Sequence, residues 1–286
     1  MSSLQTPIIE PSDLITILGN ENLILVNAGS GPVARERYLK EHIKGALYLD
    51  LDTQLSDVKD NPANGGRHPL PQVDQFGETL MQAGISNSSH VVIYDDKGGA
   101  NAAARFWWML IAAGHEKVQV LNGGIQAAEK AGIPMKSGEE KSGQRSTYKI
   151  SGWELPLANM DEVEIAARSE DHMVIDVRDA DRFQGLTEPI DLVAGHIPGA
   201  VNIPLSRSLD EKTLFKSPET LKILFDNELG QTPPENVIVH CGSGVTACHT
   251  ILAMAYAGIG IPTLYVGSWS EWSRNNKAIA TSEIDK

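Results

Sequence analysis

Short, nearly continuous runs of apolar residues recur along the chain, each about as long as a single strand. They are LILVNA, VVIYD, VQVL, MVIDV, NVIVH and TLYVG, which begin at residues 23, 91, 118, 173, 236 and 263. Such runs, rich in β-branched residues and without polar alternation, are typical of strands covered on both faces. Stretches at 102–113 and 245–257 indicate helices between them. Alternating strands and helices predict an α/β fold with mainly parallel sheets flanked by helices.

This pattern of strands and helices occurs twice along the chain. A strand, a polar segment and the motif H-I-x-G-A occupy residues 23–51 and recur at 173–205, which places His42 and His196 in matching positions. A second matched pair, strand–loop–helix–strand, aligns Asp95 of the first copy with Cys241 of the second. Two long copies indicate a domain duplication rather than a solenoid. Because both copies carry the histidine and only one carries the thiol, we expect the histidines to be structural.

The duplication predicts two tandem domains. The N-terminal domain is expected at 1–135 and the C-terminal domain at 153–286, joined by a linker at 136–152. The linker segment is polar and lacks any periodicity of apolar residues.

Charge and composition exclude several classes of partner. The chain of 286 residues carries a formal net charge of -13, which argues against a general affinity for nucleic acid or anionic membranes. No apolar run is long enough to span a bilayer, and the first residues resemble neither a secretory signal nor a transit peptide. The two cysteines form no disulfide framework, so we expect free thiols in the cytoplasm.

Cys241 stands at the end of a predicted strand, directly before a turn that contains Gly242 and Gly244. Ligands of open α/β sheets bind beyond the carboxyl ends of the strands. Backbone N–H groups of the turn and the positive end of a helix beginning near Val245 would stabilise a thiolate there. We therefore predict that Cys241 is a nucleophile, whereas Cys248 is expected to be a small core residue.

Other chemistries fit this loop less well. A Cys-dependent phosphatase needs an arginine six residues after the cysteine, where Ala247 stands. A dinucleotide loop is matched by Gly242, Gly244 and Ala247, but the next strand ends without an acid to hold a ribose. A serine-nucleophile elbow, G-x-S-x-G, is not matched, because Cys241 stands where the motif has its first glycine. The nearby His and Cys residues lack the spacing of a zinc site, and no metal is expected.

Four segments together resemble the rhodanese superfamily in its two-domain form. They are DVRDADRF, GHIPGAVNIP, HCGSGVTA and VGSWSEW, at residues 176–183, 195–204, 240–247 and 266–272. The resemblance implies two tandem rhodanese-like domains, of which only the C-terminal one is catalytic. It also implies a sulfurtransferase in which Cys241 carries the transferred sulfur as a persulfide, with no organic cofactor.

Within that family, the loop Cys-Gly-Ser-Gly-Val-Thr is similar to that of the 3-mercaptopyruvate sulfurtransferases. Relatives that prefer thiosulfate typically carry basic residues directly after the cysteine. The resemblance implies that Arg182 binds the donor's carboxylate, while Arg178, directly after a strand, is expected to form an internal ion pair. Residues 186–195 hold no arginine, although relatives usually carry a second carboxylate-binding one there. Thiosulfate therefore stays open as the alternative donor.

The resemblance further implies an Asp–His–Ser arrangement, for which the matching residues are Asp52, His68 and Ser243. Ser243 would polarise the donor's keto oxygen or deliver a proton, with His68 as its base.

The persulfide is expected to lie among the backbone N–H groups of the loop, which belong to Gly242, Ser243, Gly244, Val245 and Thr246. The donor is a small anionic sulfur compound, and the acceptor is a small thiol, thioredoxin, or cyanide in vitro. A non-enzymatic persulfide carrier or sensor is the alternative from another functional class.

Overall fold

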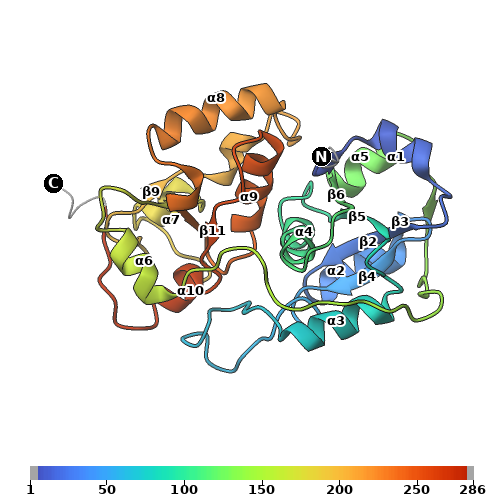
Figure 1. The fold of residues 1–286 in the computed structure, drawn as a ribbon, viewed down its shortest axis with the longest axis horizontal. Coiled ribbons are helices and arrows are strands. Elements are labelled where there is room, and N and C mark those ends of the chain that lie inside the picture. Colours follow the sequence, from blue (N-terminus) through green and yellow to red (C-terminus); the bar gives the residue numbers. More distant parts are fainter. Residues whose placement is uncertain (1–5, 282–286) are drawn as a thin grey trace. The chain divides into compact units, whose positions relative to one another are not determined.

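The computed structural model describes residues 6–281, which form two compact units. The first unit contains the chain as far as Asp57 and the stretch Leu70–Glu154. The second contains Val58–Pro69 and the chain from Leu155 onward. Figure 1 shows the helices and strands of each unit.

The first unit consists of strands β1 (Ile8–Ile9), β2 (Leu23–Gly29), β3 (His42–Ile43), β4 (Leu47–Asp50), β5 (His90–Tyr94), β6 (Val118–Leu121) and β7 (Met135–Lys136). Its helices are α1 (Pro11–Ile17), α2 (Gly31–Lys40), α3 (Val73–Gln82), α4 (Ala102–Ala112) and α5 (Gly124–Lys130). A parallel sheet has the strand order β1-β6-β5-β2-β4, and β3 pairs with β7 in a small antiparallel sheet.

Helices pack on both faces of the large sheet of the first unit, because alternate strand residues point to opposite faces. Val92 and Tyr94 of β5 share a core cluster with Leu14 of α1 and Ala128 of α5. Helix α4 contacts β2, β5 and β6 and is buried along almost its whole length. Its sequence, AAARFWWMLIA, is apolar apart from the buried Arg105, as is typical of a helix enclosed by the core.

The second unit contains strands β8 (Met173–Asp176), β9 (Val201–Asn202), β10 (Val237–His240) and β11 (Thr263–Leu264). Its helices are α6 (Met160–Ala166), α7 (Ala180–Phe183), α8 (Pro218–Leu229), α9 (Ala247–Tyr256) and α10 (Ser268–Trp272), with short 3-10 helices η1 (Leu205–Ser208) and η2 (Pro234–Asn236). The parallel sheet has the order β11-β10-β8-β9.

The core of the second unit places two tryptophans of α10 beneath the sheet. Trp269 and Trp272 are buried in one cluster with Val174 of β8 and Ile238 of β10. Their indole N–H groups donate to backbone carbonyls, which satisfies the polar edge of each ring. Helix α6 begins with a reciprocal capping box between Asn159 and Glu162.

Both units confirm the predicted α/β fold with parallel sheets. Each apolar run forms a strand of the expected unit, and the helices predicted at 102–113 and 245–257 are α4 and α9. No helix within residues 6–281 is long and apolar enough to cross a membrane.

Two segments lie elsewhere than the sequence suggested. Residues 136–152, expected as a linker, pack on the first unit, where Tyr148 is buried and its hydroxyl lies 3.2 Å from His115 Nδ1. Residues Val58–Pro69, expected within the N-terminal domain, belong to the second unit. Neither segment has a helical or strand period of apolar residues, so the sequence did not indicate which unit each would join.

Candidate active site

Cys241 lies between β10 and α9, at the carboxyl end of the central strand pair. Its side chain is buried, and its N–H donates to Ser268 Oγ at 3.1 Å. Its carbonyl accepts from the N–H of Trp269 at 3.0 Å. Both backbone groups of Cys241 are thus held by residues of α10, which fixes the backbone position from which the thiol projects.

Gly244 shapes the loop that follows the thiol. Its φ of +72° lies in the left-handed region, and a Cβ there would stand 2.4 Å from the carbonyl oxygen of Val266. Only glycine fits, because any side chain would collide with backbone. Within residues 6–281, no protein acceptor takes the N–H groups of Gly242, Ser243, Val245 or Thr246. These donors and the N-terminus of α9, which starts at Ala247, make the loop suited to an anion.

The matching loop of the first unit encloses an anion of its own. The carboxylate of Asp95 accepts from the N–H groups of Lys97, Gly99, Asn101 and Ala103, at 2.7–3.2 Å. Burial raises the pKa of Asp95, and these four hydrogen bonds oppose that effect. The duplicated loop therefore closes around a carboxylate in one unit and carries a thiol at the same position in the other.

His68 and Ser243 lie in contact. His68 Nδ1 is 2.8 Å from Ser243 Oγ, a hydrogen-bond distance. Ser243 is buried and follows the thiol by two positions. The sequence had placed His68 in the opposite domain, but the segment that carries it packs with the unit of Ser243.

Three contacts anchor the segment that carries His68. The N–H of Gly65 donates to Glu271 Oε1 at 2.8 Å, and the N–H of Arg67 donates to Ser270 Oγ at 3.0 Å. Gly66 has a φ of +82°, and a Cβ on it would lie 2.4 Å from the carbonyl oxygen of Gly267. The segment can approach α10 this closely because Gly66 has no side chain.

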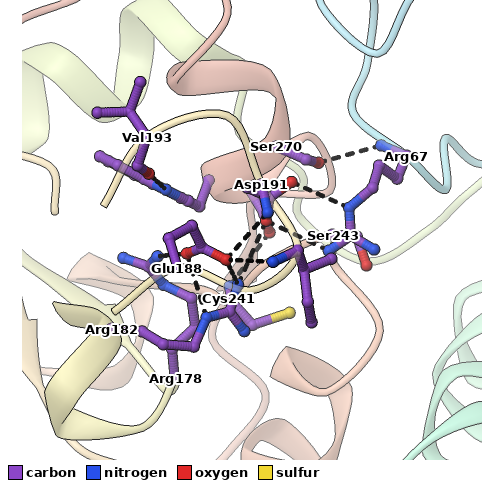
Figure 2. Close-up of polar contacts among 12 residues, drawn as sticks. Arg67, Arg178, Arg182, Glu188, Asp191, Val193, Cys241, Ser243 and Ser270 are labelled. Atoms are coloured by element: carbon purple, nitrogen blue, oxygen red, sulfur yellow. Dashed lines mark hydrogen bonds and ion pairs between the residues drawn. The ribbon is translucent and has the colours of Figure 1, made fainter. Parts of the chain in front are cut away.

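Arg182, the predicted carboxylate-binding residue, lies beside the loop and contacts two acids of the chain (Figure 2). Its Nε and Nη2 donate to Glu188 at 3.1 and 2.7 Å, and Nη2 also lies 3.4 Å from Asp191 Oδ2. The Arg182 guanidinium is 3.6 Å from where a Cβ on Gly242 would stand. Burial raises the pKa of Glu188, but the hydrogen bonds from Arg182 and from two backbone N–H groups bring it below its ordinary value.

Asp191 binds two more arginines that the sequence analysis overlooked. Its side chain is fully buried, and its Oδ1 accepts from Arg67 Nε at 3.0 Å and from Arg274 Nη1 at 3.2 Å. Figure 2 shows Arg67, Asp191 and Glu188 grouped around Cys241 and Ser243. Arg67 is adjacent to His68 in the sequence, and this adjacency was the available signal.

A buried ion pair lies at the strand ends beneath the loop. Arg178 donates to Asp176 from Nε and Nη2, as expected of an arginine directly after a strand, and stacks over Trp269. Burial opposes ionisation of Asp176, but attraction to His240 and Arg178 holds its pKa below the ordinary value. Arg178 also reaches Glu188 at 3.2 Å, which joins this pair to the arginines above.

The remaining sequence-predicted residues lie as follows. Asp52 belongs to the first unit, where its carboxylate accepts from Ser30 Oγ at 3.4 Å, and its coupling to His68 stays a prediction. Cys248 is buried, with its Sγ 3.4 Å from the carbonyl oxygen of Gly244. The rings of His42 and His196 each contact a backbone carbonyl at 2.7 Å and stack on an aromatic ring, which agrees with structural roles. Within residues 6–281, no cluster of three metal-ligating side chains is present.

Two stretches of the chain, residues 11–131 and 159–275, match the family model of the rhodanese-like domain. The 3-mercaptopyruvate sulfurtransferase of Mus musculus is 39% identical over 252 residues, which cover 85% of this chain and 80% of the mouse protein. The thiosulfate sulfurtransferase of Rattus norvegicus is 36% identical over 247 residues, covering 84% and 80%. A solved 3-mercaptopyruvate sulfurtransferase from Leishmania major matches with a TM-score of 0.80 at 33% identity, over 93% of this chain and 74% of that one.

Proposed function

The chain belongs to the rhodanese family, and we propose that it is a sulfurtransferase that takes sulfur from 3-mercaptopyruvate through a persulfide on Cys241. One observation carries this proposal. Cys241 opens a loop of backbone N–H donors, in the place where the duplicated loop of the first unit holds the Asp95 carboxylate with the same kind of donors. A loop that binds an anion through N–H groups suits both a thiolate and the terminal sulfur of a persulfide.

In the first half-reaction, the Cys241 thiolate attacks the sulfur of the donor. The new S–S bond forms as the donor's C–S bond breaks, and pyruvate leaves as its enolate, which then takes a proton. In the second, an acceptor thiolate attacks the terminal sulfur and regenerates the Cys241 thiolate. Dividing the transfer in this way is covalent catalysis.

Ser243 and His68 have the geometry for the proton step. The 2.8 Å contact allows the Ser243 hydroxyl to give its proton to the enolate while His68 Nδ1 supplies the proton that replaces it on Ser243 Oγ. Arg182 would bind the donor's carboxylate through the N–H groups that Glu188 and Asp191 do not use. Asp52 would complete the arrangement by orienting His68.

The acceptor would be a small thiol or thioredoxin, and cyanide would serve in vitro. The proposed compartment is a reducing one such as the cytoplasm, where Cys241 would remain a free thiol.

Mass spectrometry of the intact protein tests the proposal. Incubation with 3-mercaptopyruvate and no acceptor should add one sulfur atom and release one pyruvate per chain. Cys241→Ser should abolish both, whereas the matched control Cys248→Ala should retain both. A sulfur adduct on Cys241→Ser would refute the proposed nucleophile.

Thiosulfate is the second candidate donor, because a guanidinium beside the loop would attract this dianion as well as a carboxylate. The loop itself has no cation, but the guanidinium of Arg67 stands 3.0 Å from the Cβ position of Gly242. Rates with the two donors under identical conditions decide between them. A stable persulfide that is not turned over by a small thiol or by cyanide would instead indicate a sulfur carrier.

A further inference from the structure

Residues 186–195 lie beside the loop that follows Cys241 and contain no arginine. Residues 186–195 contribute Glu188 and Asp191, and both acids bind arginines that come from elsewhere in the chain. The positive charge of the site therefore comes from other segments, and Arg67 and Arg182 are the residues whose guanidiniums reach the loop after Cys241.

Arg67 is the nearer of these two. Its Nη2 is 3.0 Å from the Cβ position of Gly242, whereas Arg182 Nη2 is at 3.6 Å. Its neighbour His68 contacts Ser243, so these adjacent residues face adjacent residues of the loop. The backbone of Arg67 is fixed by Ser270 Oγ, which leaves little freedom in where its side chain can go.

Asp191 fixes the guanidinium of Arg67. Its two oxygens accept from Nε and Nη2 at 3.0 and 3.3 Å, and the second also lies 3.4 Å from Arg182. Within residues 6–281, the side-chain hydrogen bonds of Arg67 and Arg182 use Nε and Nη2, so Nη1 of each can still donate. The Arg67 side chain is 26% exposed, which leaves it accessible to a ligand.

The connected ion-pair network carries one net positive charge. It joins four guanidiniums, of Arg67, Arg178, Arg182 and Arg274, to the three carboxylates of Asp176, Glu188 and Asp191. In a chain whose overall charge is -13, this local excess of positive charge would attract an anionic donor.

We propose that Arg67 determines donor specificity by binding the donor's carboxylate together with Arg182, with Asp191 as the residue that positions both guanidiniums. This inference rests on the proposed function. A fixed pair of guanidiniums binds a carboxylate more strongly than one, because each adds charge-assisted hydrogen bonds without a new ordering cost.

Steady-state kinetics of Arg67→Gln with two donors tests the inference. One donor is 3-mercaptopyruvate, and the other is 1-mercaptopropan-2-one, which keeps the thiol and the keto group but has a methyl group in place of the carboxylate. We expect kcat/KM for mercaptopyruvate to fall about 10- to 100-fold, mainly through KM, because a hydrogen bond to a charged group contributes about 1.5–3 kcal/mol. Turnover of mercaptopropanone should change less than about threefold. Arg67→Lys should recover part of the loss, since it restores the charge without the planar fork.

Arg274→Gln is the matched control, because Arg274 binds the same carboxylate of Asp191 but is not among the nearest neighbours of Gly242. It should affect both donors alike. An unchanged KM in Arg67→Gln, an equal loss with both donors, or the same donor-selective loss in Arg274→Gln would overturn the inference. The proposed function fails separately, if the wild-type protein forms no persulfide with mercaptopyruvate. Pyruvate binding to Cys241→Ser with and without Arg67→Lys gives a second measurement should Arg67→Gln not fold.

Discussion

His68 Nδ1 and Ser243 Oγ lie 2.8 Å apart, although 175 positions separate the two residues in the chain. The contact depends on a segment from the first copy of the duplication that packs within the second unit. It gives Ser243 a base at hydrogen-bond distance, and it can be tested by substituting each partner.

His68→Ala and Ser243→Ala should each lower kcat with mercaptopyruvate by about 100-fold, and the double variant should be little worse than either alone. General acid–base groups contribute on this scale, and two residues acting as one unit are not additive. Thiosulfate is the control donor, because its leaving sulfite needs no proton. Additive losses, or equal losses with both donors, would argue against a shared proton step.

Replacing Asp95 should affect stability rather than chemistry. Asp95→Ala leaves four backbone N–H groups of the first unit without their acceptor, and those of Gly99 and Ala103 are buried, so we expect the free energy of unfolding to fall by about 3 kcal/mol. Asp95→Asn keeps one acceptor oxygen and should cost less. Urea titration measures the loss, and persulfide formation on Cys241 by the folded protein should match the wild type. An unchanged midpoint in Asp95→Ala would contradict this interpretation of the loop.

His249 should make the protein less stable as the pH falls. It is buried against Phe215, and within residues 6–281 neither ring nitrogen has a hydrogen-bond partner. Burial lowers the pKa of His249 from 6.5 to about 3. Below pH 6.5 His249 therefore binds a proton in the unfolded chain but not in the folded one. The free energy of unfolding falls by about 1.4 kcal/mol per pH unit as a result.

His249→Leu should remove that dependence and be nearly neutral at pH 7. The fall in unfolding free energy between pH 7 and pH 5 should be about 2 kcal/mol smaller than in the wild type. His172→Gln, a change at an exposed histidine, is the control and should keep the wild-type dependence. Parallel curves for His249→Leu and the wild type would show that another group dominates.

Gly66→Ala should displace Arg67 and His68 together. The added methyl would lie 2.4 Å from the carbonyl oxygen of Gly267, at a φ of +82° that alanine rarely adopts. We expect at least a 100-fold loss of kcat/KM with mercaptopyruvate. Gly138→Ala is the control, because it shares a positive φ but has open space around it and lies in the other unit. Retained activity in Gly66→Ala would show that the segment need not lie so close to α10.

The fold follows from the sequence because strands such as β5 and β10 are continuous apolar runs bounded by turns, which only a doubly covered sheet accommodates. The position of Cys241 could also be predicted, because the apolar run before it and the glycines after it are both local features of the sequence. The ion pairs of Asp191 could not, because they join segments that neither period nor spacing relates. Arg67 is adjacent to His68, which the sequence did indicate. The polar stretch 58–69 that carries both residues gave no sign of the unit in which it packs.

The placement of Val58–Pro69 means that the duplicated halves are no longer modular. A gene fragment that begins after the first copy would encode Cys241, Ser243 and Arg182 but neither Arg67 nor His68. Any ancestor in which the catalytic copy stood alone must have lacked this contribution or obtained it from another chain. Splitting the protein between its halves and adding back a peptide of residues 58–69 would measure how far the two copies have become dependent on each other.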